Sequence, residues 1–214
     1  MEKVSVEYNE KQLAIIESAQ KLFAENGFDG TSVRDIAQEA GINVAMISYY
    51  FGSKEKLMEA IIEQKSNNTR LKVENLLADE SLSPTEKVNI LIDDYIDKFL
   101  AEQKFHRIML REQVIEKVTC ISTSIYELKK RNLISIRKLI QHGQKQGVFK
   151  KHIDVVLMTA TLVGTVSHMI TSQRFYREVN NLEDLSEVEF QKHLKKKLSI
   201  YLKNLFKVML TYEA

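Results

Sequence analysis

The side chains best suited to contact another molecule lie between Asn43 and Lys54, in the segment NVAMISYYFGSK. A helix over residues 44–51 would place Ile47 and Phe51 on one face, because successive residues are 100° apart. The side chains on the opposite face are small or weakly polar: Ala45, Ser48 and Tyr49, with Met46 beside them. Hydroxyl groups form hydrogen bonds, and small apolar groups pack on methyl groups. This segment is therefore suited to recognise a surface.

Lys54 adds a positive charge where the next helix should begin. Ser53 can cap that helix. The unpaired backbone N–H groups of the first turn, together with the helix dipole, favour an anion such as phosphate. Tyr50 lies at the edge of the buried face of the segment, so core packing and contact with a partner are both open for it.

Three helices are expected around this segment. The first covers about residues 10–26, where apolar residues recur at steps of three or four. The second begins after Ser32, whose hydroxyl can cap it while Asp35 reaches back to the cap backbone. Only residues 41–43 (GIN) separate it from the third. Two short helices joined in this way, after a stabilising helix, are typical of a helix-turn-helix DNA-binding motif.

Longer helices should follow to the end of the chain. Its 214 residues include one proline, seven glycines and no tryptophan, which favours helices over sheets. The expected helices cover about residues 54–77, 85–102, 122–146, 154–176 and 187–210, with a shorter one through Met109. The sequence therefore predicts an all-α fold, with a three-helix helix-turn-helix domain at residues 1–53 and a larger helical domain at residues 54–214.

The charge distribution suggests a second candidate for nucleic-acid binding. Up to Ala60 there are six basic and ten acidic residues, a balance of 6 − 10 = −4, although the whole chain carries +2. The C-terminal run KHLKKKLSIYLK is the most basic patch. Leu194, Leu198 and Leu202 recur through it at helical spacing, so the solvated face of an amphipathic helix is the preferred interpretation.

Other classes of protein are less consistent with the sequence. The lone Cys120 is expected to be a buried thiol and not a nucleophile. Together with the charged N-terminal start, which lacks a signal-peptide core, it favours a cytoplasmic protein. Residues 155–173 carry no charged side chain, but their many hydroxyl groups favour a buried helix over a membrane span. The five histidines are scattered without metal-ligand spacing. We therefore expect no enzyme, no metal and no cofactor.

An ordered set of motifs links the N-terminal part to a known family. The stretch LFAENGFDGTSVRDIAQEAGINVAMISYYFGSKEKLMEAII closely resembles the DNA-binding domain of the TetR/AcrR family of bacterial transcriptional regulators. The resemblance covers about residues 12–63, whereas the remainder is similar only in length and helical pattern. It implies a homodimer, a helical ligand-binding and dimerisation domain, and a ligand-responsive repressor that a small molecule releases from a palindromic operator.

The resemblance also implies roles for individual residues, because family members contact bases and phosphates from matching positions. The expected DNA-binding residues are Thr31, Arg34, Asn43, Val44, Ala45, Met46, Ser48, Tyr49, Tyr50 and Lys54. The chain departs from the common pattern at three of them. The cap is Asn43 where Ser or Thr is usual, Ser48 replaces a frequent aromatic residue, and Tyr49 replaces a frequent His. Base preference is therefore not transferable.

The C-terminal domain should bind an apolar or amphipathic small molecule, because its helices carry more large flexible and aromatic residues than a core requires. The expected lining residues are Tyr95, Phe99, Phe105, Met109, Tyr126, Met158 and Met169, with His106 and Thr161 as polar anchors. The alternative is a packed core that binds nothing. The last two long helices should form the dimer, with Ala160 and Gly164 allowing close approach. A helical adaptor or an enzyme without DNA binding remains the alternative function.

Overall fold

The computed structural model describes residues 8–114 and 119–212, and within them the chain is helical without strands. The helices are α1 (Glu10–Asn26), α2 (Val33–Glu39), α3 (Val44–Phe51), α4 (Lys54–Ala78), α5 (Pro84–Ala101), α6 (Gln103–Val114), α7 (Cys120–Lys145), α8 (Val155–Thr171), α9 (Gln173–Val179) and α10 (Glu187–Leu210). The all-α prediction is confirmed, and the predicted bounds of α1, α3 and α10 agree with those observed.

The chain divides into two compact units. The first contains the described residues up to Leu71 together with those between Gln103 and Asn132, and the second contains Lys72–Glu102 and the described residues from Leu133 onward. Helices α4 and α7 each contribute to both units. The boundary predicted after residue 53 stays a prediction, because compactness does not define where a functional domain begins.

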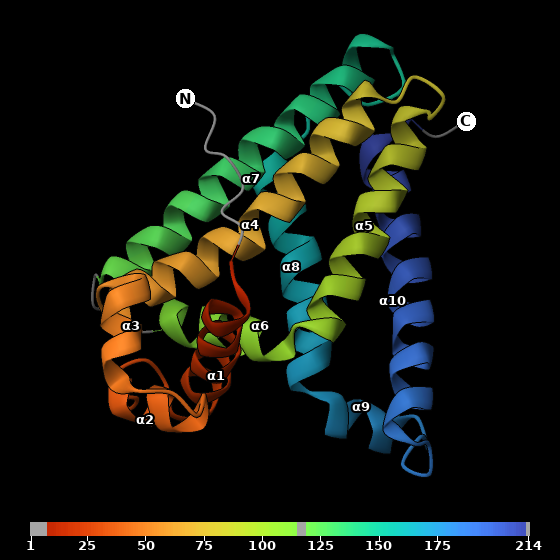
Figure 1. Cartoon of the computed structure of the whole chain (residues 1–214). Coiled ribbons are helices and arrows are strands. Elements are labelled where there is room, and N and C mark those ends of the chain that lie inside the picture. The colour runs from red at the N-terminus through yellow and green to blue at the C-terminus, as the bar shows by residue number, and fades with distance from the viewer. Residues whose placement is uncertain (1–7, 115–118, 213–214) are drawn as a thin grey trace. The chain divides into compact units, whose positions relative to one another are not determined.

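The first unit has a core built around α1, and α1, α2 and α3 lie together in Figure 1. Phe23 of α1 and Ile36 of α2 are 0% exposed, and Ile47 of α3 is 1% exposed. Helix α6 packs against α1 and adds Phe105 and Ile108 to the same core. The helix-turn-helix and α6 therefore share one apolar interior.

The second unit is built on the contact between α5 and α10, which lie side by side in Figure 1. Helix α10 buries every fourth residue of one stripe: Phe190, Leu194, Leu198, Leu202, Phe206 and Leu210. Its lysines meet carboxylates of α5, with Lys195 at 2.6 Å from Asp97 and Lys203 at 2.5 Å from Asp93. The interpretation of the basic run as an amphipathic helix is confirmed.

One helix expected over residues 154–176 is instead two, and that prediction is wrong. Helix α8 ends at Thr171, α9 begins at Gln173, and their axes differ by 75°. Neither glycine nor proline causes the break. The Ser172 hydroxyl donates to the carbonyl of His168 at 2.6 Å, and the Thr171 hydroxyl donates to that of Ser167 at 3.0 Å. Bonds from hydroxyl groups to the preceding turn often accompany bends in helices, although Thr161 makes one to Leu157 without breaking α8.

Two further expectations concern Cys120 and membrane insertion. The side chain of Cys120, expected to be a buried thiol, lies outside the part of the chain that the structure describes. Among the described residues, no single helix is long and apolar enough to cross a membrane. Only the bent pair of α8 and α9 meets that criterion in combination.

Candidate nucleic-acid interface

Helix α2 begins at a cap formed by Ser32 and Asp35. The Ser32 hydroxyl accepts a hydrogen bond from the backbone N–H of Asp35 at 3.2 Å, and the Asp35 carboxylate accepts one from the backbone N–H of Ser32 at 2.8 Å. The carboxylate also accepts from the Ser32 hydroxyl at 2.8 Å. These bonds, the backbone one first, lower the pKa of Asp35. The predicted capping pair is confirmed and defines where α2 starts.

Helix α3 begins at Asn43, as the sequence predicts. The side-chain oxygen of Asn43 accepts a hydrogen bond from the backbone N–H of Ala45 at 2.9 Å. Gly41 turns the chain between α2 and α3 with a φ of 65°, which glycine adopts without steric cost. The oxygen keeps a second lone pair beside the cap bond, and the amide nitrogen keeps both of its donors for a partner.

The two faces of α3 are those predicted from the sequence. Ile47 is 1% exposed, whereas Tyr49 is 78% exposed and has no structural role in the core. The exposed positions beside Tyr49 carry small side chains: Val44, Ala45 and Ser48. Met46 and Tyr50 are half-buried, and the Tyr50 ring meets that of Tyr49 edge to face with 5.1 Å between ring centroids. Tyr50 therefore takes part in packing while its ring supports the exposed Tyr49.

Thr31, which the resemblance placed among the DNA-binding residues, faces the interior. It is 1% exposed, and its hydroxyl donates to the carbonyl oxygens of Gly27 at 2.8 Å and Leu22 at 3.3 Å. Its side chain therefore stabilises the loop between α1 and α2. The buried side chain of Thr31 is therefore not available to contact DNA.

Lys54, the expected phosphate contact, is half-buried and already hydrogen-bonded. Its Nζ donates to the carbonyl oxygens of Phe28 and Thr31, each at 2.8 Å, and lies 4.2 Å from the centroid of the Phe28 ring. An ammonium group has three N–H donors, so one remains beyond these two bonds.

Two other lysines in this part of the chain form ion pairs with carboxylates. Lys21 of α1 pairs with Glu39 of α2 at 2.6 Å, and Lys56 of α4 pairs with Glu59 at 2.7 Å. Arg34 is exposed on α2. With the acidic balance of this part of the chain, few positive charges are available for phosphate groups, so non-specific attraction to DNA should be weak.

The residues expected to line an effector pocket do not form one group. Tyr95, Phe99, Met158, Thr161 and Met169 belong to the second unit, and Phe105, His106, Met109 and Tyr126 belong to the first. In the second unit, Phe99 and Met158 are buried, and the Tyr95 ring lies 5.8 Å from that of Phe99. Burial raises the pKa of Tyr95. The Thr161 hydroxyl donates to the carbonyl of Leu157 in its own helix.

The members that lie in the first unit have different environments. Phe105 is buried in the core shared by α1 and α6, and Met109 packs against that core. His106 is half-buried, and desolvation, followed by the charge of Lys65, lowers its pKa to about 4, so the imidazole is neutral near pH 7. Tyr126 is 63% exposed and does not face an interior.

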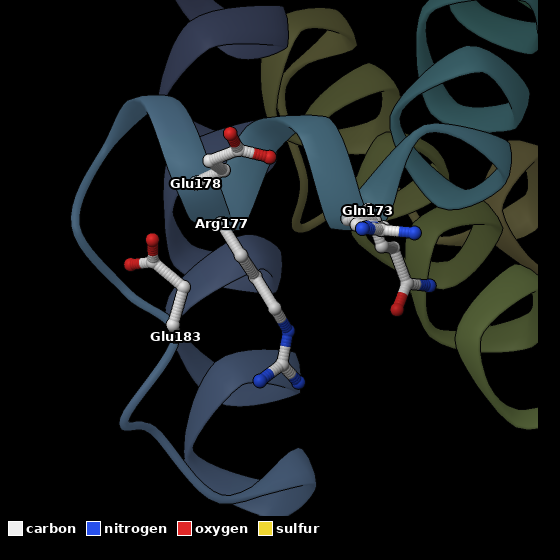
Figure 2. Close-up of a pocket in the computed structure, with 5 residues that line it drawn as sticks. Gln173, Arg177, Glu178 and Glu183 are labelled. Atoms are coloured by element: carbon white, nitrogen blue, oxygen red, sulfur yellow. The ribbon is translucent and has the colours of Figure 1, made fainter.

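A cavity of about 590 Å³ lies beside α9 in the second unit, and Figure 2 shows its lining. Gln173, Arg174, Arg177, Glu178 and Glu183 form its wall. Arg177 donates to the carbonyl of Leu185 at 2.9 Å and to Glu187 at 2.7 Å, and its guanidinium covers the Phe190 ring at 3.9 Å. This charged, open site shares no residue with the expected apolar pocket. Among the described residues, no cluster of His, Cys, Asp or Glu could hold a metal ion.

The two small residues predicted for the dimer lie exposed on α8. A side chain added at Gly164 would meet no other atom of the chain within 4 Å, and Ala160 is exposed four residues earlier. The same helix exposes Val156 and, at 65%, Leu157. Helix α10 exposes large apolar side chains as well: Val188, Ile200, Tyr201 and Val208.

Three capped helices, with the exposed face of the third free of any role in the core, define a DNA-binding protein of the helix-turn-helix class. The comparisons with known proteins agree. Residues 15–61 match the family model for bacterial regulatory proteins of the tetR family, and residues 84–199 match the tetracyclin repressor-like C-terminal domain. The chain therefore belongs to the tetR family of bacterial transcriptional regulators.

Individual relatives and structures support this assignment. The probable HTH-type transcriptional regulator YttP of Bacillus subtilis is 36% identical over 62% of this chain and 64% of its own length. The HTH-type transcriptional repressor NicS of Pseudomonas putida is 30% identical over 69% of this chain and 71% of its own. The fatty acid degradation regulator FadR of Bacillus halodurans has the same fold, with a TM-score of 0.71 and 22% identity over 92% of this chain and 97% of that protein. The relatives give no support to an adaptor or an enzyme.

Proposed function

We propose that this regulator is a repressor whose homodimer binds a palindromic operator and is released by a small molecule. The observation that carries the proposal is the exposed face of α3. Tyr49 is 78% exposed on a helix whose other face is buried at Ile47, and the small side chains beside it leave room for base edges. Binding to an operator would place the protein in the cytoplasm.

We expect α3 to contact bases directly, but with few hydrogen bonds that distinguish one base from another. The proposed contacts are Asn43, Val44, Ala45, Met46, Ser48, Tyr49 and Tyr50, with Arg34 of α2 against phosphate. No Arg, Lys or Gln stands on the outward face of α3, so the bidentate contacts that best distinguish guanine and adenine are missing. Apolar contacts with thymine methyl groups and hydrogen bonds from Ser48 and Tyr49 are what this face can provide.

The exposed apolar residues of α8 and α10 support a two-fold dimer through these helices. Leu157 and Val156 on α8 and Tyr201 on α10 would be covered by the same residues of a second copy. Ala160 and Gly164 would let the two α8 backbones approach closely. Each protomer would then place one α3 in successive major grooves, about 34 Å apart.

Buried and half-buried side chains of the second unit support the proposal of an apolar or amphipathic effector. Tyr95, Phe99 and Met158 combine two aromatic rings with a flexible thioether, a mixture that can repack around an acyl or ring system. The FadR fold relative regulates fatty acid degradation, but at 22% identity it provides only the fold. Acyl compounds therefore enter as one arm of a screen that also contains ring systems and cations.

The experiment selects a binding site from random duplex DNA and then measures affinity by fluorescence polarisation. We expect a palindrome whose affinity falls strongly when either half-site is scrambled. Compounds that raise the melting temperature are then tested for release of the operator, and tenfold weaker binding corresponds to about 1.4 kcal/mol of differential affinity. Recovery of no preferred sequence would contradict the DNA-binding proposal. Thermal stabilisation without release would show that the compound is not the inducer.

A further inference from the structure

The loop between α1 and α2, residues Gly27–Thr31, is contacted by two helices outside the helix-turn-helix. From α4, Lys54 Nζ donates to the carbonyl oxygens of Phe28 and Thr31, each at 2.8 Å. From α6, the guanidinium of Arg111 lies over the α-carbon of Gly27, so closely that a Cβ there would be 2.6 Å from Cζ. All of these residues belong to the first unit.

The loop in turn determines where α2 begins. The Thr31 carbonyl that accepts from Lys54 belongs to the residue before Ser32, the N-cap of α2. The Phe28 carbonyl accepts from both Lys54 and the backbone N–H of Thr31, which closes the turn. Inside the turn, the Thr31 hydroxyl donates to the Gly27 carbonyl at 2.8 Å. Displacing Lys54 would therefore release the turn that orients the first helix of the helix-turn-helix.

Side chains of the protein already accept hydrogen bonds from backbone N–H groups at the start of α4. Hydrogen bonds from the backbone N–H of Glu55 itself, and then from the Ser53 hydroxyl, lower the pKa of the Glu55 carboxylate. The Ser53 hydroxyl also accepts from the backbone N–H of Lys56 at 3.2 Å. The Glu55 carboxylate and the Ser53 hydroxyl thus each accept a hydrogen bond from one of the backbone N–H groups that a phosphate would use at a helix N-terminus.

We propose that Lys54 is a positioning residue of the helix-turn-helix, which joins α4 to the α1–α2 loop, and that it makes no phosphate contact. Its ammonium group lies between two carbonyl oxygens and the face of the Phe28 ring, all of which favour a positive charge. The inference rests on the proposed function only in treating α2 and α3 as the helices that contact DNA. It predicts that Lys54 affects DNA affinity through the placement of α2.

The test uses Lys54→Met, which keeps an apolar chain against Phe28 and removes the ammonium group. Lys56→Met is the matched control, since Lys56 lies on the same first turn, is exposed, and forms an ion pair with Glu59 at 2.7 Å. Ile92→Val, a truncation in the core of the second unit, controls for a loss of stability that leaves the loop unchanged. Backbone amide hydrogen exchange on the free full-length protein gives one readout, and operator affinity across a series of salt concentrations gives the other.

In Lys54→Met we expect the amides of Ile36 and Ala37 in α2 to exchange about tenfold faster than in the parent protein, with α10 amides unchanged. We expect operator affinity to fall by a similar factor at every salt concentration, leaving the slope of log affinity against log salt equal to that of Lys56→Met. A phosphate contact would instead lower that slope by about 0.9. Neither control should accelerate exchange in α2.

The proposal stands only if exchange in α2 accelerates and the slope matches the control. A slope reduced by about 0.9 beyond Lys56→Met would establish a phosphate contact and overturn it. Unchanged exchange in α2 would also overturn it, because Lys54 would then not hold the loop. The exchange measurement needs no DNA, so a failure of the proposed operator binding would leave this part of the result interpretable.

Discussion

Arg111 and Gly27 pack so closely that no side chain larger than hydrogen fits between them. A Cβ built on Gly27 would lie 2.6 Å from Arg111 Cζ and 2.8 Å from Nη2. Gly27 ends α1 with φ 80° and ψ 170°, a conformation that is almost restricted to glycine. The end of α1 and helix α6 therefore meet at a residue whose backbone demands glycine and whose free space is filled by the end of the flexible Arg111 side chain.

Replacing Gly27 by alanine should destabilise the protein by about 1–3 kcal/mol from backbone strain alone, with an added cost for displacing Arg111. In an Arg111→Ala background the added cost disappears and the backbone strain remains, so the two changes should not be additive. Urea unfolding of the four proteins gives the coupling. Gly41→Ala is the control, because Gly41 also has a positive φ but no atom within 4 Å of an added Cβ. Strictly additive effects would show that Arg111 simply moves aside.

The cap of α2 should make stability depend on acid. Hydrogen bonds from Ser32 lower the pKa of Asp35, so its contribution is complete above the ordinary aspartate pKa, about 3.9, and is lost as the pH falls through the lowered value. Melting temperatures of the parent and Asp35→Ala should therefore differ most at neutral pH and converge below about pH 4. Glu17→Ala, at an exposed position of α1, should show no such convergence. A constant difference across this range would mean that Asp35 acts only through its shape.

Loss of the Ser32 hydroxyl should weaken the same cap from its other side. Ser32→Ala removes the acceptor for the backbone N–H of Asp35 and should lower the free energy of unfolding by about 1 kcal/mol. Ser32→Gly should lower the free energy of unfolding by only about a few tenths of a kcal/mol, because glycine also adopts the extended cap conformation. Chemical denaturation measures both. Equal effects of the two variants would argue that the hydroxyl does not serve as the cap.

Local sequence signals were enough to predict the helix-turn-helix. Contacts between residues far apart in the sequence could not be predicted. Ser32 and Asn43 each accept a hydrogen bond from a backbone N–H at most three residues later, so sequence spacing was enough to place α2 and α3. Lys54, by contrast, bonds carbonyl oxygens 26 and 23 residues earlier. Side-chain type and position at a helix start suggested a phosphate contact, and nothing local indicated the loop that already satisfies two of its donors.

The same distinction explains the larger part of the chain. The stripe of α10 was visible because its buried residues recur every fourth position. The break between α8 and α9 was not, because the hydroxyl bonds of Thr171 and Ser172 to the preceding turn are of the same kind as those that Thr159 and Thr161 make inside the unbroken α8. That α6 shares a core with α1, although about 80 residues separate them in sequence, follows from the fold as a whole.

Tyr49 and Tyr50 are adjacent but should respond differently to truncation. Tyr49 is 78% exposed, so Tyr49→Ala should leave the melting temperature nearly unchanged while lowering operator affinity about tenfold, which is the effect of losing one base contact. Tyr50 packs against the core, so Tyr50→Ala should lower stability first. Thermal unfolding and polarisation assays on both variants separate the two roles. Normal operator affinity in Tyr49→Ala would remove Tyr49 from the interface.

Gly164 allows a test of the dimer that does not disturb the fold. It is exposed on α8, and an added Cβ would meet nothing within 4 Å in the same chain, so Gly164→Leu should be tolerated by the protomer. Leucine is also a better helix former than glycine by about 0.8–1 kcal/mol, which favours α8 itself.

If the α8 helices of two protomers pack through Ala160 and Gly164, the larger side chain must force them apart. Sedimentation should then show folded monomers, with operator affinity close to that of a single half-site. Lys145→Leu, an exposed change at the end of α7, should leave the dimer intact. A Gly164→Leu protein that still sediments as a stable dimer would place the two-fold interface elsewhere on the second unit.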